Sequence, residues 1–120
     1  MGYYKITIRP TDRNYSLYVR RDGECKICGR TDIKLEACHY HGRGKESTRF
    51  DDENVWCLCF NCHKATHENK SIFTNFLIKM IGIQRYDLLT LRANTYKKRD
   101  DELDKIIIKE KLKSVGLEWK

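Results

Sequence analysis

The chain lacks the features that mark secreted, fibrous or membrane proteins. Its 120 residues include one proline, no internal repeat, no low-complexity tract and no apolar run long enough to cross a bilayer. No apolar stretch resembling a signal peptide is found near the N-terminus. We therefore expect a single domain without membrane association in a reducing, cytoplasmic compartment.

Positive charge is in excess. Lysine and arginine outnumber the acidic residues by 24 to 17, which leaves a formal net charge of +7. Such a balance favours a polyanionic partner such as nucleic acid. Charge alone is a weak indicator, because many basic proteins bind no polyanion. The oligomeric state is left open, a homodimer included.

Four of the six cysteines form two C-x₂-C pairs, Cys25 with Cys28 and Cys59 with Cys62. Each pair places two thiolates within about one turn of chain, so two pairs supply the four soft ligands of a tetrahedral zinc ion. Disulfides are the alternative, but a reducing compartment disfavours them. We predict one structural zinc ion per chain and interpret Cys57 as a small buried residue of the core.

Residue patterns predict an α+β fold. The expected elements, in chain order, are an extended arm or strand over 3–9, a helix over 12–21, a strand over 33–41, a polar loop over 42–53, a strand over 55–58, a helix over 60–70, and three further helices separated at Gly82 and at 97–100. This organisation divides the single domain 1–120 into an N-terminal arm and helix (1–22), a zinc-stapled core (23–70) and C-terminal helices (71–120).

The four histidines lie between the cysteine pairs or just after the second pair. His63 and His67 are one helical turn apart, so both imidazoles can bind one ion. His39 lies on the predicted strand. A divalent ion beside a neutral histidine suits phosphodiester hydrolysis, because the ion neutralises phosphate charge while the imidazole takes a proton from water. Asn54 would orient His39 by accepting its second N–H, although His39 taken alone is more typical of a buried core histidine.

With these residues the sequence resembles the HNH, or ββα-metal, endonuclease family, and most closely its zinc-knuckle phage branch of NinG-type recombination nucleases. The matching segments are 25–29, 38–43, 47–51, 53–54 and 59–63. The resemblance implies a ββα-metal core with His39 as the general base, Asn54 as the central motif residue and His63 as a ligand of the catalytic ion. It also implies that His67 is a further ligand, as in some branches of the family; a surface histidine is the alternative.

Cys38 departs from the family pattern, which often has an aspartate or histidine ligand before the base. If Cys38 ligates the catalytic ion, its thiolate favours zinc, nickel, cobalt or manganese over magnesium. If Cys38 is instead a small hydrophobe of the core, His63 and His67 must hold the ion together with waters and phosphate oxygens.

The polar loop supplies the candidate DNA contacts. Arg43 and Arg49 carry guanidinium groups, which suit phosphate oxygens, and His41 is a weaker candidate beside them. For each of the three, a solvated loop side chain is the simpler alternative.

The sequence therefore predicts a DNA endonuclease that uses one divalent ion (Mn²⁺, Mg²⁺, Ni²⁺, Co²⁺ or Zn²⁺). Its main rival is a non-catalytic zinc-binding module that binds nucleic acid and whose histidines are structural. A third reading is a protein-interaction module built on the C-terminal helices. The form of the DNA substrate and any sequence preference are left open.

Overall fold

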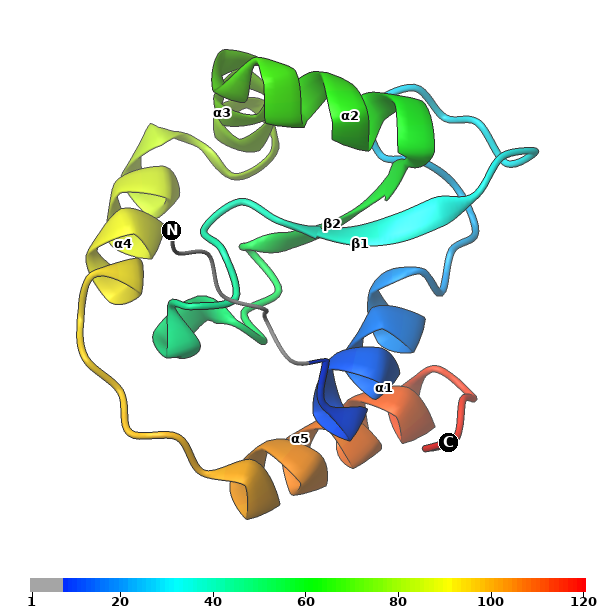
Figure 1. The fold of residues 1–120 in the computed structure, drawn as a ribbon, viewed down its shortest axis with the longest axis vertical. Helices are drawn as coiled ribbons and strands as arrows, with labels where there is room; N and C mark the ends of the chain where they lie inside the picture. The colour runs from blue at the N-terminus through cyan, green and yellow to red at the C-terminus, as the bar shows by residue number, and fades with distance from the viewer. Residues whose placement is uncertain (1–7) are drawn as a thin grey trace, which may run out of the picture.

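The computed structural model describes residues 8–120, so all but the end of the arm predicted over 3–9 lies outside the described residues. These residues form a mixed α+β fold with five α-helices, a 3₁₀ turn and a two-stranded sheet (Figure 1). The elements are α1 (Pro10–Val19), β1 (Leu35–His39), the 3₁₀ turn η1 (Glu46–Thr48), β2 (Val55–Cys59), α2 (Phe60–Glu68), α3 (Lys70–Ile81), α4 (Ile83–Ala93) and α5 (Asp101–Ser114). Among the described residues, no helix combines the length and apolarity that a membrane span requires.

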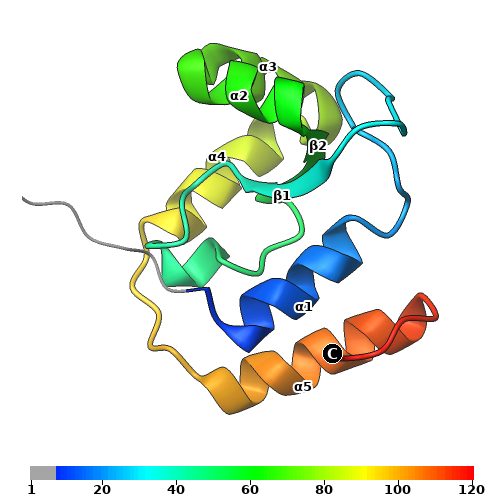
Figure 2. The same cartoon turned by 45° about the vertical axis from the view of Figure 1, so that its right-hand side comes forward.

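The sheet lies at the centre of the fold. Strands β1 and β2 pair antiparallel, from Leu35 opposite Cys59 to His39 opposite Val55. Helices α2 and α3 lie on one side of the sheet, and α1 and α5 lie on the other (Figures 1 and 2). Four of the five residues of β2 are buried, as expected for a strand covered from both sides. A hairpin followed directly by a helix agrees with the predicted order of elements.

Two apolar clusters hold these layers together. The first joins the sheet to α3 and α4 and contains Cys25, Cys38, Tyr40, Leu58, Cys59, Phe73, Leu77 and Leu89. The second joins the sheet to α1 and α5 and contains Tyr15, Val19, Val55, Cys57, Ile108 and Leu112. The interior position predicted for Cys57 is confirmed, since its side chain is 2% exposed.

Local signals set the boundaries of the C-terminal helices. The single helix predicted over 60–70 ends earlier, at Glu68, because the Asn69 side chain accepts a hydrogen bond from Ser71 N and begins α3. Gly82 separates α3 from α4 as predicted, and its φ of +85° is a conformation that favours glycine. Residues 95–100 join α4 to α5 outside any helix, in agreement with the predicted break.

Candidate functional site

The two cysteine pairs meet at one point. The ligand atoms of Cys25, Cys28, Cys59 and Cys62 all lie within 4.8 Å of one another, and Cys28 Sγ is 3.7 Å from Cys59 Sγ. A tetrahedron with Zn–S bonds of about 2.3 Å has sulfurs about 3.8 Å apart. The four thiols therefore fit a structural zinc ion. The turn after each first cysteine brings a backbone N–H to its sulfur, from Cys28 N to Cys25 Sγ and from Cys62 N to Cys59 Sγ.

The electrostatics of the cluster also suit a cation. Burial would raise the pKa of Cys25, but hydrogen bonds from backbone N–H groups outweigh it and lower this pKa to about 6. Burial and hydrogen bonds to the neighbouring sulfurs raise the pKa of Cys62. Cys25 is thus favoured as a thiolate over Cys62, and a bound divalent cation would favour the ionised form of its thiol ligands.

Cys38 lies in the first apolar cluster, and the structure corrects its assignment as a candidate metal ligand. Its side chain is 1% exposed, and Cys38 Sγ donates to the carbonyl oxygen of Glu36 at 3.6 Å. Burial raises the pKa of this thiol, and adjacent residues of a strand point to opposite faces, so Cys38 and His39 diverge. Cys38 is therefore a core residue that does not line the cleft, and its thiol gives no basis for the expected preference for particular metals.

This placement predicts different outcomes for two substitutions of Cys38. Cys38→Ala should cost about 1–2 kcal/mol of unfolding free energy and leave the metal content unchanged, because it removes one buried sulfur. Cys38→Asp should cost more than about 4 kcal/mol, because it buries a charge without a partner. Denaturant titration and elemental analysis measure both effects. A Cys38→Asp protein as stable as Cys38→Ala would contradict the core placement.

Three of the histidines border one cleft of about 370 Å³ between the end of β1 and helix α2. Its lining residues are Ala37, His39, Tyr40, Gly42, Arg43, His63, Thr66, His67, Lys70 and Phe73. The fold therefore brings together the predicted base and both predicted histidine ligands, which are separated by more than twenty residues in the sequence.

His39 has a defined tautomer in this cleft. Its Nε2 atom is 2.9 Å from the carbonyl oxygen of Arg49, and a carbonyl oxygen can only accept, so Nε2 carries the proton and Nδ1 keeps a lone pair. Burial, with a contribution from the nearby Arg43 guanidinium, lowers the pKa of His39 to about 4. The ring is therefore neutral at pH 7, which is the protonation state that a general base requires.

Asn54 supports the loop instead of the His39 ring, and this corrects the predicted hydrogen bond between the two side chains. Asn54 is fully buried. Its Oδ1 accepts from His41 N at 2.8 Å, and its Nδ2 donates to the carbonyl oxygens of His41 and Thr48, each at 2.9 Å. The amide thus clamps both ends of the loop that follows His39. Asn54 therefore affects the cleft only indirectly, through the backbone of His41 and Thr48 to which it is hydrogen-bonded.

On α2, His63 has a partner that sequence patterns did not indicate. Its Nδ1 lies 2.8 Å from Oε1 of Glu36 on β1, and an ionised carboxylate can only accept, so Nδ1 carries the proton and Nε2 remains available as a ligand. The His67 ring lies 5.9 Å from the His63 ring, centroid to centroid, in a T-shaped arrangement. A carboxylate behind a histidine is the usual support of a metal-binding imidazole, but among the described residues only the four cysteines bring three or more possible ligand atoms together.

The three candidate DNA contacts have different environments in the structure. Arg43 lines the cleft and has a side chain that is 27% exposed, so its phosphate contact stays a prediction. Arg49 is only 5% exposed and its guanidinium binds the Asp12 carboxylate, which corrects its assignment as a DNA contact. His41 packs edge-on against Tyr40 and is not among the residues lining the cleft, so its role stays untested.

Lys70, the first residue of α3, also lines the cleft, and no sequence pattern indicated this. Its ammonium group donates to the carbonyl oxygen of Tyr40 at 2.5 Å and lies 4.0 Å above the Tyr40 ring. Burial lowers the pKa of Lys70. The helix cap at Asn69 was the one sequence signal for the position of Lys70, because it starts α3 at this residue.

Nothing in the sequence indicated that Glu36 faces α2, since that depends on how β1 and α2 pack.

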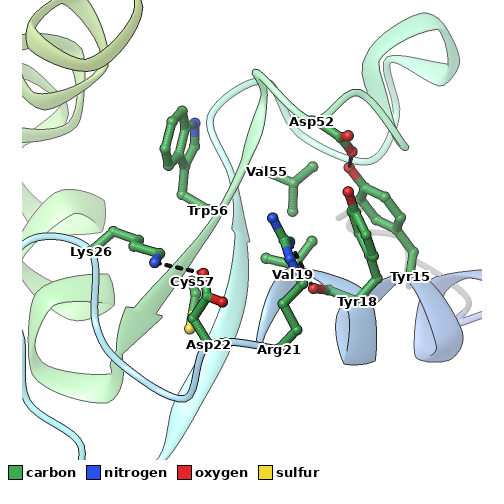
Figure 3. Close-up of a pocket in the computed structure, with 10 residues that line it drawn as sticks. All are labelled: Tyr15, Tyr18, Val19, Arg21, Asp22, Lys26, Asp52, Val55, Trp56 and Cys57. Atoms are coloured by element: carbon green, nitrogen blue, oxygen red, sulfur yellow. Dashed lines mark hydrogen bonds and ion pairs between the residues drawn. The ribbon is translucent and has the colours of Figure 1, made fainter. Parts of the chain in front are cut away.

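A second hollow, between α1 and β2, holds none of the predicted catalytic residues (Figure 3). It has a volume of about 100 Å³ and is lined by Tyr15, Tyr18, Val19, Arg21, Asp22, Lys26, Asp52, Val55, Trp56 and Cys57. Within it the Tyr15 hydroxyl donates to Asp52 Oδ1 at 2.5 Å, and Lys26 pairs with Asp22 at 2.9 Å. The histidine cleft is therefore the better candidate for chemistry.

Comparison with known proteins gives one family. The family model described as "Bacteriophage Lambda NinG protein" matches residues 8–118, which is nearly all of the chain. No curated protein and no solved structure shows a significant match. The match over 8–118 includes both the cysteine cluster and the cleft lined by His39, His63 and His67.

Proposed function

The chain belongs to the NinG family, and from this premise we propose that it is a metal-dependent DNA endonuclease of the HNH, or ββα-metal, type. The observation that carries the proposal is the cleft in which His39, His63 and His67 meet. It combines a neutral histidine of defined tautomer with two histidines one helical turn apart. These are the parts that hydrolysis of a phosphodiester bond by one divalent ion requires.

In this proposal His39 is the general base. Nε2 donates to the Arg49 carbonyl oxygen, so Nδ1 accepts the proton of the attacking water. A base with a pKa of about 4 is weak at pH 7. A phosphodiester in the cleft brings negative charge that offsets the Arg43 guanidinium, and this raises the pKa of His39 toward the useful range.

His63 and His67 would hold the divalent ion, with Glu36 either behind His63 or as a third ligand. When bound, this ion neutralises the scissile phosphate and stabilises the leaving oxygen. Glu36 fixes the tautomer of His63, so that Nε2 stays unprotonated and directed away from the carboxylate. Imidazole and carboxylate ligands without a thiolate accept manganese, cobalt, nickel and zinc, and accept magnesium less well.

Arg43 and Lys70 would bind the phosphate oxygens of DNA at the rim of the cleft. Both line it, and cations at the edge of a partly desolvated cleft attract a phosphodiester more strongly than cations in open solvent. The net charge of +7 supports the same partner. The four cysteines would keep α2 in place, because Cys62 directly precedes His63 in the chain.

The test is cleavage of supercoiled plasmid by zinc-loaded protein, with Mg²⁺, Mn²⁺, Co²⁺, Ni²⁺ or Zn²⁺ added separately. We expect nicked and linear products with at least one of these ions. Metal is added and not removed by chelation, because stripping the structural zinc would unfold the protein. Tight DNA binding without cleavage under every ion would instead favour the non-catalytic nucleic-acid-binding module.

Glu36→Gln should weaken the response to added metal. The amide cannot hold the His63 tautomer as an ionised carboxylate does, so the metal concentration that gives half-maximal cleavage should rise about 10- to 100-fold. Titration of the activating ion measures this shift. Glu68→Gln is the matched control, since Glu68 is an exposed residue at the end of α2. Equal metal responses of the two variants would exclude Glu36 from the metal site.

A further inference from the structure

A buried ion pair connects α1 to the loop that follows His39. The Asp12 side chain is 1% exposed, and its two oxygens accept from Nε and Nη2 of Arg49 at 2.8 and 2.6 Å. Asp12 Oδ2 also accepts from the backbone N–H of Arg9 at 2.8 Å. Burial by itself would raise the pKa of Asp12, but the hydrogen bonds and the positive charge of Arg49 outweigh it and lower this pKa. The carboxylate is therefore ionised and holds Arg49 by a fork of two bonds.

Arg49 contributes to the cleft through its backbone. Its carbonyl oxygen is the acceptor for His39 Nε2, while its side chain is fixed by Asp12 and its Nη1 donates to the carbonyl oxygen of Arg43 at 3.1 Å. Phe50, the residue after Arg49, also contacts α1, because its ring packs edge-on against Tyr15 with centroids 5.4 Å apart. Helix α1 thus holds the peptide group between residues 49 and 50 from both sides.

We propose that Asp12 is a positioning residue for His39: with Arg49 it aims the carbonyl oxygen that sets the tautomer and the plane of the His39 ring. The inference rests on the proposed function, in which His39 is the base. It assigns a role in the chemistry to helix α1, which contributes no residue to the lining of the cleft. Because the acceptor is a backbone atom, a side-chain substitution at residue 49 cannot delete it and alters only how it is held.

Two variants test the ion pair. Arg49→Lys keeps the charge but loses the planar fork, and Asp12→Asn keeps one acceptor but loses the charge. For both we expect kcat for plasmid cleavage to fall about 10- to 100-fold, because a misplaced base affects the reaction step. The Kd for DNA should change less than about threefold in Arg49→Lys; Asp12→Asn also removes the carboxylate 3.8 Å from Arg43 Nε, so Arg49→Lys alone tests the Kd. Long-range ¹H–¹⁵N spectra of the imidazoles should show one tautomer at His39, protonated at Nε2, in the wild type, and a mixture of tautomers in each variant.

Tyr15→Phe is the matched control on the same helix. It removes the hydrogen bond to Asp52 but keeps the ring against Phe50, so it should lower the thermal midpoint and leave kcat and the His39 tautomer unchanged. A loss of kcat in Tyr15→Phe equal to that in Arg49→Lys would reduce the ion pair to ordinary structural support and overturn the proposal.

Two further results would overturn it as well: a wild-type His39 protonated at Nδ1, or an unchanged tautomer and kcat in both ion-pair variants. The spectra of the wild type decide the first point even if neither variant folds. If the wild type cleaves no DNA with any ion, the endonuclease proposal fails, but the tautomer spectra still test whether the ion pair sets His39.

Discussion

His39→Ala is expected to abolish plasmid cleavage while leaving the protein folded and able to bind DNA. The imidazole contributes in the transition state, where it takes the proton of the attacking water, and loss of a general base costs about 10²- to 10⁴-fold in rate. Its loss should change the Kd for DNA by less than about threefold, since DNA affinity comes mainly from cations that contact phosphates. Single-turnover cleavage with the activating ion and fluorescence anisotropy with labelled DNA measure the two quantities.

His41→Ala is the control for this experiment. His41 lies two residues away but does not line the cleft, and its buried Nε2 has no hydrogen-bond partner among the described residues, so it is a neighbouring imidazole that is not placed to act as the base. We expect His41→Ala to keep kcat within about fivefold of wild type, an allowance smaller than the loss expected for a base. If His39→Ala cleaves at the wild-type rate and His41→Ala does not, the assignment of the base must move to His41.

Cys59→Ser is expected to remove the bound zinc and unfold the protein. Structural zinc contributes about 10–16 kcal/mol of apparent binding free energy in zinc-finger peptides, which matches or exceeds the roughly 5–15 kcal/mol of net stability in a typical domain. Cys59 is fully buried, belongs to the first apolar cluster and caps α2 through its sulfur. Elemental analysis should fall from about one zinc per chain in the wild type to well below one, and far-ultraviolet circular dichroism should lose its helical signal.

Cys57→Ala is the matched control for the zinc ligand. Cys57 lies on the same strand and is buried to a similar degree, but it belongs to the second apolar cluster and not to the four-sulfur cluster. Its replacement should cost about 1–2 kcal/mol and leave the zinc content at one per chain. Full zinc content in Cys59→Ser, or freshly purified wild type without zinc, would contradict the assignment.

Patterns within a few residues of one another predicted much of the fold. Each half of the four-sulfur cluster follows from C-x₂-C spacing, because a short turn leaves two thiols little freedom to separate, whereas the contact between Cys28 and Cys59, 31 residues apart, depends on tertiary packing. Gly82 predicted a break between two helices, and its φ of +85° in the structure agrees with that break. The spacing of His63 and His67 predicted that both rings share one face of a helix, and the rings lie 5.9 Å apart on α2. These features depend on turn geometry and helical period, which the chain carries locally.

The corrected site assignments concern contacts between segments that are not neighbours along the chain. Arg49 was expected to face DNA, but it binds a carboxylate 37 residues earlier in the chain. Asn54 was expected to hold an imidazole, but it holds the backbone of the loop, and Glu36 meets His63 only because β1 packs beside α2. Loop arginines and buried amides have several possible partners, and the sequence does not rank these partners.

By itself the sequence determined which chemical groups are present and which of them are neighbours along the chain: paired thiols, histidines one helical turn apart, and a strong excess of positive charge. Only the tertiary structure decided which groups face each other: the direction of Cys38, the partner of Arg49 and the tautomer of His39. The physical reason is that burial and hydrogen bonding are properties of pairs brought together by packing. A buried charge or amide takes the partner that the assembled layers place beside it.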